Sequence, residues 1–290
     1  MNLVVGATGL LGTEICRVLA GTGRPVRALV RATAEAGKVA ALKTLKVELA
    51  TGDVKDAASL AAACRGASTV ITTASSTFSR HEGDSIQSVD RDGQLALVDA
   101  AKAAKVGHFV LVSFPPAKFA SPLDEAKRAV EQRLRASGLA YTILQPTFFM
   151  EVWLSPALGF DAAKGEAKIY GSGEQKISWI SFRDVAKFAA AAAGHKAARN
   201  ATLPLGGPDA LSPLEVVKIF EATTGRRFSL QTVPEPALRA QWAAASDPLQ
   251  KSFGALMLDF AGGAVIEMHG TAKTFAVRLL SVREFATATK

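Results

Sequence analysis

The sequence predicts an α/β protein with a doubly wound, mostly parallel sheet covered by helices on both faces, and a smaller C-terminal subdomain. Short runs rich in β-branched residues alternate with helical patterns through the first half of the chain. A turn with three glycines follows the first of these runs directly. Because the alternation is regular and the segments are not copies of one another, we favour a doubly wound sheet over a repeat architecture.

The expected elements of the first half follow in order, and each strand is followed by a helix. The strands are Leu3 to Val5, Val26 to Val30, Lys46 to Leu49, Thr69 to Thr72, Phe109 to Ser113 and Tyr141 to Leu144. The helices are Gly12 to Ala20, Ala34 to Leu45, Ala57 to Cys64, Arg91 to Ala104 and Leu123 to Ala136.

The residue pattern of the sequence changes after Pro146. Glycines punctuate the span from Gly165 to Gly173, which indicates a binding loop. A strand at Trp179 to Ser181 is followed by a helix that Asp184 is expected to cap, because its carboxylate can accept orphan amide hydrogens. We expect this strand and helix to return to the main sheet.

The remaining C-terminal part has its own start and stop signals. Ser212 and Pro213 read as a helix cap and a first-turn proline. A strand is expected at Phe228 to Val233 and a helix from Pro234 to Lys251. The chain therefore divides into a domain of residues 1–150, to which 177–206 return, and a subdomain of residues 151–290.

Composition excludes several classes of protein. Hydrophobic residues make up 49% and charged residues 21% of the 290 residues, as in an ordinary globular chain rather than a disordered or fibrous one. Cys16 and Cys64 have no CxxC spacing, so we expect reduced, apolar residues rather than a disulfide or zinc site. The histidines show no metal-binding or Ser-His-Asp spacing. No metal is expected.

Location and partners follow from what the sequence lacks. The first strand begins at once, so we expect no signal peptide and a cytoplasmic protein. No apolar run reaches the roughly 18 residues of a membrane span. The net charge of +8 is dispersed and accompanies no nucleic-acid motif, so a phosphate-bearing small ligand is favoured over nucleic acid or membrane.

The glycine-rich turn is the sharpest motif. It reads Gly-Ala-Thr-Gly-Leu-Leu-Gly between a strand and a helix. Gly6 permits the tight turn, Gly9 lets the backbone approach a pyrophosphate, and Gly12 allows close packing of helix on strand. The helix N-terminus presents amides to the phosphates. The turn therefore predicts a Rossmann-type dinucleotide site that includes Gly6, Thr8, Gly9, Leu10, Leu11 and Gly12.

The residue after the second strand selects the cofactor. NAD-specific proteins place a carboxylate there for the ribose 2′-hydroxyl, but this chain has Arg31. Its guanidinium can bind a 2′-phosphate bidentately and Lys38 can approach the same group, so NADP is favoured over NAD. The alternative is a surface arginine without a ligand.

Further cofactor contacts are expected at the ends of later strands, where ligands of doubly wound folds bind. Asp53 and Val54 lie where a loop borders the adenine. The ends of the fourth and sixth strands pass near the cofactor, the latter near the nicotinamide. These segments are Thr73, Ala74 and Ser75, then Pro146, Thr147 and Phe148.

Several later segments extend these signals along the chain. They are Gly52-Asp53-Val54, Ala100-Ala101-Lys102, Phe109 to Ser113, Lys127 to Pro146, Asp184-Val185-Ala186 and Leu205 to Pro208. With the glycine turn and Arg31, the chain resembles the NmrA-like and isoflavone-reductase-like branch of the atypical short-chain dehydrogenases. The resemblance implies either an NADP-dependent reductase of small organic molecules or a redox-sensing regulator that binds cofactor without turnover.

The resemblance also assigns catalytic positions. Typical short-chain dehydrogenases use a serine, a tyrosine and a lysine four residues after the tyrosine. Ser113 and Lys127 match, but Leu123 stands at the tyrosine position. The isoflavone-reductase branch relies on the lysine, which suits this chain. Lys127 can stabilise or protonate an anion formed by hydride transfer. The alternative is a solvated helix lysine.

Two function hypotheses follow. The first is a reductase that transfers hydride from NADPH to a quinone, enone or phenolic-type substrate, with Phe149 and Trp153 lining an apolar pocket. Large aromatics are often core instead, which we favour for Trp179. The second is a non-catalytic NADP-binding sensor or interaction protein. The fold cannot decide between them, and we favour the enzyme. Monomer and homodimer both stay open.

Overall fold

The structure is a computed structural model that describes residues 1–79 and 81–289. These residues form two compact units, each assembled from separated stretches of chain. The first unit comprises Met1–Phe114, Glu125–Gln145 and Val185–Leu203. The second unit comprises Pro115–Asp124, Pro146–Asp184 and Pro204–Lys290, of which Lys290 lies outside the described residues.

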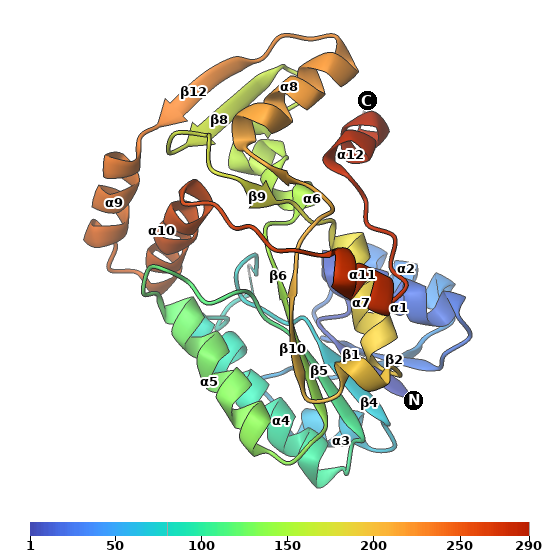
Figure 1. Ribbon diagram of the computed structural model, residues 1–290. Coiled ribbons are helices and arrows are strands. Elements are labelled where there is room, and N and C mark those ends of the chain that lie inside the picture. Colours follow the sequence, from blue (N-terminus) through green and yellow to red (C-terminus); the bar gives the residue numbers. More distant parts are fainter. Residues whose placement is uncertain (80, 290) are drawn as a thin grey trace. The chain divides into compact units, whose positions relative to one another are not determined.

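The first unit is built around a seven-stranded sheet with the order β10-β6-β5-β4-β1-β2-β3 (Figure 1). The pairs that join β1 through β6 are parallel. β1 lies between β2 and β4, so the chain runs outward in opposite directions from β1 and creates the switch point of a doubly wound fold. The strands are β1 Asn2–Val5, β2 Val26–Val30, β3 Glu48–Thr51, β4 Thr69–Thr72, β5 His108–Val112, β6 Tyr141–Pro146 and β10 Ala201–Leu205.

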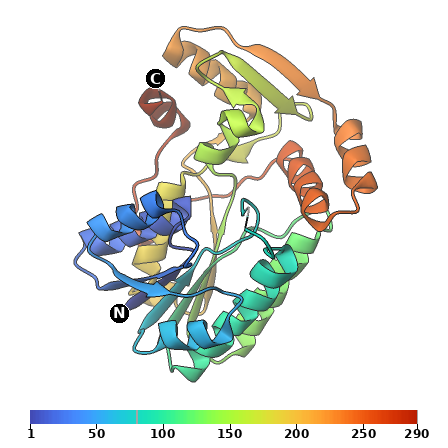
Figure 2. The same ribbon diagram turned by 180° about the vertical axis from the view of Figure 1, so that it is seen from behind.

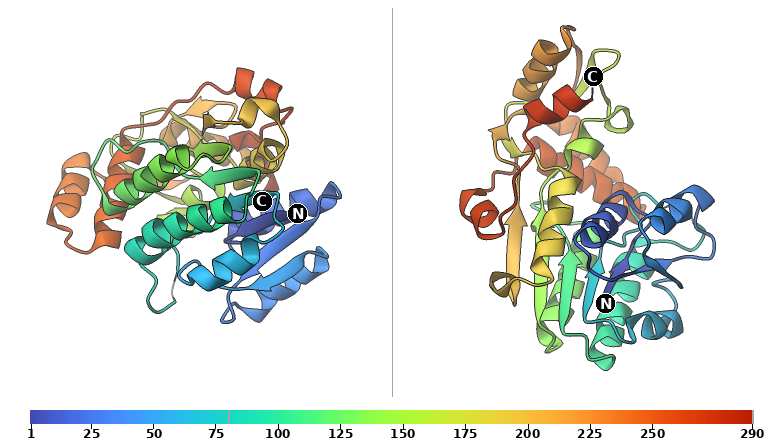
Figure 3. Two further views of the ribbon diagram at one scale, coloured as in Figure 1. Left: turned by 90° about the horizontal axis from the view of Figure 1, so that it is seen from below. Right: turned by 90° about the vertical axis from the view of Figure 1, so that its right-hand side faces the viewer.

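Helices cover both faces of this sheet. On one face α3, α4 and α5 contribute to a hydrophobic core with the buried strand residues (Figure 2). On the other face α7 lies beside α1 (Figure 3), and Arg24, just after α1, donates a 2.6 Å hydrogen bond to the Ala190 carbonyl of α7. The helices are α1 Leu10–Gly21, α2 Ala36–Thr44, α3 Ala57–Cys64, α4 Gln94–Ala103, α5 Pro122–Ala136 and α7 Phe182–Ala192.

The doubly wound fold predicted from the sequence is confirmed, and β2, β4 and α3 have the predicted bounds. The prediction of a strand at Trp179 to Ser181 in the main sheet is wrong. The neighbouring strand β9, Ile177–Ser178, pairs instead with β11, Ala210–Leu211, in a separate two-stranded sheet. The seventh strand of the main sheet is β10, which polar Thr202 and Pro204 obscured in the sequence.

Helix α4 is preceded by a π-helical turn, Ile86–Gly93, so the prediction of one helix from Arg91 was too simple. Ser85 caps this turn reciprocally with Ser88. A π-helix has i→i+5 hydrogen bonds, and such turns occur often at functional sites. Here the turn places Asp90 in the interior with no exposed surface.

The second unit contains a three-stranded sheet in the order β12-β8-β7 and the two-stranded β11-β9 sheet. The predicted binding loop at Gly165 to Gly173 is wrong, because its centre is β8, Glu166–Tyr170, with glycines of positive φ at both ends. The helix predicted from Pro234 breaks between Ala244 and Pro248. Apart from short 3₁₀ turns at Pro156–Leu158 and Lys196–Ala198, the remaining elements are β7 Phe160–Asp161, β12 Ser229–Val233, α6 Met150–Trp153, α8 Pro213–Thr224, α9 Glu235–Ala244, α10 Pro248–Ala261, α11 His269–Thr274 and α12 Val282–Ala288.

Local signals explain several of these boundaries. The predicted cap at Ser212 is confirmed as a capping box with Glu215. The cap predicted at Asp184 is wrong, because Ser181 accepts the amide hydrogen bond at the start of α7. Asp184 lies within the first turn of α7 and accepts a 2.6 Å hydrogen bond from the Leu280 amide. Cys16 and Cys64 are free and buried. None of the described helices is long and apolar enough to span a bilayer.

Candidate functional site

The turn between β1 and α1 is shaped by two glycines that no other residue replaces without strain. Gly6 has φ of +83°, and a Cβ there would lie 2.7 Å from Thr73 Oγ1 and 2.8 Å from the Ala74 amide nitrogen. A Cβ on Gly12 would lie 2.1 Å from the Gly6 carbonyl oxygen. The first glycine therefore makes the turn and the third lets α1 start against it, as the spacing predicts.

The tip of the turn has backbone amides that could bind the pyrophosphate of a dinucleotide. Gly9 is the N-cap of α1 and provides no side-chain cap, which leaves the first helical amides for a ligand. Gly9 and Leu10 are exposed, Thr8 is half-buried and Leu11 is buried. A Cβ on Gly9 would approach only the Gly6 carbonyl oxygen, at 3.3 Å. Gly9 is therefore open on the side from which a phosphate would arrive.

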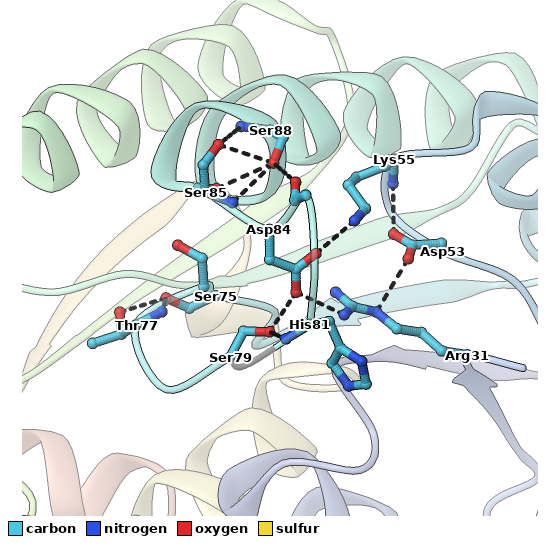
Figure 4. A network of polar contacts seen from close by, with 12 residues as sticks. Arg31, Asp53, Lys55, Ser75, Thr77, Ser79, His81, Asp84, Ser85 and Ser88 are labelled. Atoms are coloured by element: carbon cyan, nitrogen blue, oxygen red, sulfur yellow. Dashed lines mark hydrogen bonds and ion pairs between the residues drawn. The ribbon is translucent and has the colours of Figure 1, made fainter. Parts of the chain in front are cut away.

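Arg31 follows β2 directly and holds two carboxylates (Figure 4). Its Nε lies 3.2 Å from Asp53 Oδ2, and its Nη1 lies 2.7 Å from Asp84 Oδ2. Asp53 belongs to the loop after β3 and Asp84 to the loop after β4. Three loops at the carboxyl edge of the sheet thus meet at this guanidinium. Val54, the neighbour of Asp53, is buried in the hydrophobic core.

Lys55 is the second cation at this place. Its Nζ lies 2.6 Å from Asp84 Oδ1, so the two Asp84 oxygens contact one cation each. We call Lys55 and Asp84 the outer pair. Burial raises the pKa of the Asp84 carboxyl, but hydrogen bonds from Lys55, Ser79 and Arg31 outweigh it and lower the pKa to about 2. Lys38, which the sequence predicts near the same phosphate, is exposed on α2 and pairs with Glu35 at 2.7 Å, and its role stays a prediction.

The segment after β4 lies against the glycine turn. Thr73 and Ala74 are the residues that a Cβ on Gly6 would strike. Gln94 of α4 donates a 2.8 Å hydrogen bond to the Ala74 carbonyl and fixes this segment. The Ser75 hydroxyl lies 2.8 Å from the Thr77 hydroxyl (Figure 4).

Lys127 is buried in an ion pair. Its Nζ lies 3.1 Å from Asp90 Oδ1, and the side chains of Lys127 and Asp90 are 7% and 0% exposed. We call these residues the inner pair. Asp90 Oδ2 accepts hydrogen bonds from the Ser76 amide at 2.9 Å and the Ser76 hydroxyl at 2.6 Å. The reading of Lys127 as a solvated lysine is therefore wrong, and the inner pair ties α5 to the segment after β4.

Ser113 follows β5, and its hydroxyl accepts a 3.2 Å hydrogen bond from Arg128 Nη2. The same nitrogen donates to the Phe114 carbonyl at 2.7 Å. Arg128 also pairs with Glu131 at 2.8 Å, and Gln145 donates to Glu131 at 3.0 Å. Ser113 is thus anchored by α5, the helix that carries Lys127.

The predicted residues beyond β6 belong to the second unit or to its boundary. Pro146 ends β6, and Thr147 is held by a hydrogen bond from its hydroxyl to the Ser178 carbonyl at 2.5 Å. Phe148 and Trp153 are buried in an aromatic cluster, where Trp153 stacks on Phe260 with ring centroids 4.2 Å apart. Phe149 is half-buried. Trp179 is 1% exposed, so its expected core role is confirmed.

A cavity inside the second unit is too small for an organic substrate. It is lined by Trp153, Phe160, Tyr170, Trp179, Phe260 and their neighbours and has a volume of about 10 Å³. That volume is roughly the room one water molecule needs. Within the described residues, no group of three or more His, Cys, Asp or Glu side chains could hold a metal ion.

The chain is similar in sequence to proteins of a known family. Residues 2–257 match the NmrA-like family, so the chain belongs to this family and the predicted resemblance is confirmed. It is 35% identical to an NAD(P)H azoreductase of Xenophilus azovorans over 78% of this chain and 74% of the relative. It is 30% identical to the photosystem II assembly factor Ycf39 of Cyanophora paradoxa, over 80% and 71%.

The fold has solved counterparts. The structure of the NADPH-dependent quinone oxidoreductase QOR2 of Escherichia coli, complexed with NADPH, superposes with a TM-score of 0.80. The two sequences are 21% identical, and the match covers 100% of this chain and 99% of the other. This likeness establishes the Rossmann-type fold of the chain.

Four polar residues that contact the predicted site residues, directly or through a shared partner, were not predicted from the sequence. Lys55 and Asp84 join Arg31, Asp90 joins Lys127, and Arg128 joins Ser113. A helix-start signal was present for Asp90, because Ser85 precedes the apolar residues Ile86 and Val89. No local pattern pointed to the contact among residues 31, 55 and 84.

Proposed function

We propose that the protein is an NADPH-dependent oxidoreductase that reduces a small organic electrophile. The main support for this proposal is the β1–α1 turn, where Gly6, Gly9 and Gly12 leave an open, uncapped helix N-terminus beside Thr73 and Ala74. Arg31 at the end of the next strand supports NADPH rather than NADH. Membership in the NmrA-like family supports the same proposal.

The turn and Arg31 would hold the two phosphate-bearing parts of the cofactor. First-turn amides of α1 bind the pyrophosphate, and Arg31 binds the 2′-phosphate. Bound NADPH supplies the hydride. The remaining predicted contacts, from Asp53 to Phe148, stay predictions for the adenine and nicotinamide ends.

Lys127 is the residue that we propose for chemistry. Asp90 and the segment after β4 fix its ammonium group near the carboxyl edge of the sheet. A fixed cation stabilises the negative charge that forms on a substrate oxygen or nitrogen when hydride arrives, and it needs no reorganisation to do so. The same ammonium has three donors, so it can also hold the cofactor's ribose. Ser113 is the second polar group on this side.

Quinones, enones, azo dyes and phenolic-type compounds are the substrate classes that we propose. The azo class comes from the similarity to an NAD(P)H azoreductase. We keep half-buried Phe149 as the predicted substrate contact and expect Trp153, which is buried in the aromatic cluster, to act as its support. A cytoplasmic location stays a prediction.

The experiment is steady-state oxidation of NADPH against a panel of these four classes, with cofactor affinity measured in parallel. Turnover of at least one class that exceeds the slow oxidation without substrate supports the enzyme. Tight NADPH binding without turnover of any class contradicts it.

A second candidate is a cofactor-binding protein that acts through assembly rather than turnover. Two observations favour it: Leu123 stands where typical short-chain dehydrogenases have tyrosine, and one relative is a photosystem II assembly factor. For this candidate, NADPH should change association with a partner protein, which cross-linking with and without NADPH would detect.

A further inference from the structure

We propose that Arg31 and Lys55 form a two-cation site for the 2′-phosphate of NADPH, and that Asp84 is an internal anion that competes with this phosphate for the two cations. Asp84 then sets how strongly the chain prefers NADPH to NADH. The inference rests on the proposed function, because it extends the phosphate role of Arg31 to two residues that the sequence did not indicate.

The geometry of the site matches that of a bound phosphate. Asp84 Oδ2 lies 2.7 Å from Arg31 Nη1, and Oδ1 lies 2.6 Å from Lys55 Nζ. Two oxygens of one anion thus contact two different cations, as two oxygens of a phosphate group would. The Asp84 carboxylate therefore stands in for a phosphate (Figure 4).

The anion is much more deeply buried than the two cations. The Asp84 side chain is 2% exposed, whereas those of Arg31 and Lys55 are 24% and 29% exposed. The Ser79 hydroxyl also donates to Asp84 Oδ2. The carboxylate is covered by its own loop and its partners, while water still reaches both cations. An incoming anion can thus approach the exposed side of both cations and compete with Asp84 for them.

Asp53 has a different task from Asp84. It contacts Nε of Arg31 at 3.2 Å, and its Oδ1 accepts the Lys55 amide at 2.9 Å. Asp53 therefore orients the guanidinium through its Nε and also holds the backbone at Lys55. Arg31 and Lys55 contribute two positive charges, and Asp53 and Asp84 contribute two negative charges. Displacement of Asp84 leaves one net positive charge for the phosphate.

The exchange distinguishes the two cofactors. The 2′-phosphate of NADPH must displace the Asp84 carboxylate to reach the two cations, so Asp84 weakens NADPH binding. NADH has a 2′-hydroxyl and leaves the Asp84 contacts in place. Removal of the carboxylate should raise affinity for the phosphorylated cofactor alone, and removal of the Lys55 ammonium should lower it.

The test uses two small probes of the full-length protein, adenosine 2′,5′-bisphosphate and adenosine 5′-monophosphate, titrated by calorimetry. In Asp84→Asn, affinity for the bisphosphate should rise about tenfold, the scale of one charge-assisted hydrogen bond, while affinity for the monophosphate stays the same. In Lys55→Met, bisphosphate affinity should fall about tenfold. Asp84→Glu keeps the charge and should keep the parent's preference.

Two surface residues provide matched controls. Asp99→Asn removes an exposed aspartate that pairs with Arg133, and Lys43→Met removes an exposed lysine of α2. Both should bind each probe as the parent does. Circular dichroism checks that each variant is folded, and Lys55→Met tests the inference even if Asp84→Asn unfolds.

The outcomes separate the inference from the proposed function. If Asp84→Asn changes both probes equally or neither, or if Lys55→Met behaves as Lys43→Met does, the inference is overturned while NADPH binding by the parent still supports the function. If the parent binds neither NADPH nor NADH, the proposed function fails and the inference fails with it.

Discussion

Two lysine–aspartate pairs lie at the carboxyl edge of the same sheet, and water reaches them differently. In the inner pair the side chains of Lys127 and Asp90 are 7% and 0% exposed. In the outer pair those of Lys55 and Asp84 are 29% and 2% exposed. A charge that loses its partner in the interior is costly, whereas a partly exposed cation accepts a new partner readily. The inner pair is thus suited to a permanent role and the outer pair to exchange.

The largest expected effect comes from the glycine turn rather than from either lysine–aspartate pair. Gly9→Val should abolish NADPH binding, because the branched side chain fills the space where the pyrophosphate approaches. The fold should survive, since Gly9 has φ of −79° and an added Cβ would meet a single atom, the Gly6 carbonyl oxygen at 3.3 Å, which has to shift by only a few tenths of an ångström. Calorimetry and circular dichroism measure the two properties. Gly21→Ala, where an added Cβ meets nothing within 4 Å, is the control. Normal binding by Gly9→Val would make the turn purely structural.

The inner pair should be needed for both turnover and stability. Lys127→Met should lower the turnover of the best substrate about a hundredfold or more, because the fixed cation is lost. It should also lower the free energy of unfolding by about 3–5 kcal/mol, because Asp90 stays buried without a counter-charge. Urea denaturation and initial rates measure the two effects.

The double variant Lys127→Met/Asp90→Asn separates these effects. It should recover much of the stability, since no buried charge is left unpaired, but none of the turnover. Parent-like turnover in Lys127→Met would exclude a catalytic role for the lysine.

Arg31, which contacts Asp84 of the outer pair, should affect cofactor preference without a large effect on stability. Arg31→Ala should reduce the preference for NADPH over NADH by about tenfold or more, as expected for the loss of a charge-assisted pair of roughly 1.5–3 kcal/mol. Its unfolding free energy should change by only about 1 kcal/mol, because the guanidinium is 24% exposed and Lys55 and Ser79 still contact Asp84 when the guanidinium is removed. Fluorescence titration with each cofactor measures the preference. An unchanged ratio would show that Arg31 does not recognise the phosphate.

The smallest effect is the acid dependence of the outer pair. The folded state lowers the pKa of Asp84 to about 2 from its ordinary value of 3.8. A lowered carboxyl pKa stabilises the folded state above the ordinary value, and this contribution is lost as the pH falls towards 2. The difference in Tm between the parent and Asp84→Asn should therefore be constant above about pH 5 and shrink below pH 4. A difference that persists at pH 2 would contradict this assignment.

Local patterns were sufficient for most of the fold. The strands β1 to β6 and the turn at Gly6 were predictable because buried parallel strands are short apolar runs and only glycine fits the turn. The errors arose where one signal has two meanings. Glycines around β8 indicate a loop by composition, but here they end a strand at positive φ. The strand β10 is mostly half-exposed at the sheet edge and lacks the apolar run.

The site was predictable only where one residue follows one strand. Arg31 was found because the position after β2 has a known task. Its partners Lys55 and Asp84 lie 24 and 53 positions away in other loops, and no periodicity links such loops. Lys38 was predicted because it could approach the same phosphate as Arg31; it contacts Glu35 at the start of α2, and its role stays a prediction. The contacts of Asp90 likewise depend on tertiary packing and on a helix type that propensity does not specify.

The π-helical turn Ile86–Gly93 makes the length of this segment as important as its composition. Each residue of an α-helix turns the chain by about 100°. Deletion of one residue from the turn would convert it to ordinary α-helix and swing Asp90 away from Ser76 and Lys127, although every remaining side chain would be unchanged. Insertions and deletions should therefore be tolerated poorly between Ser85 and Gln94. A chain of this family that lost one residue there would have to neutralise its buried lysine by another route.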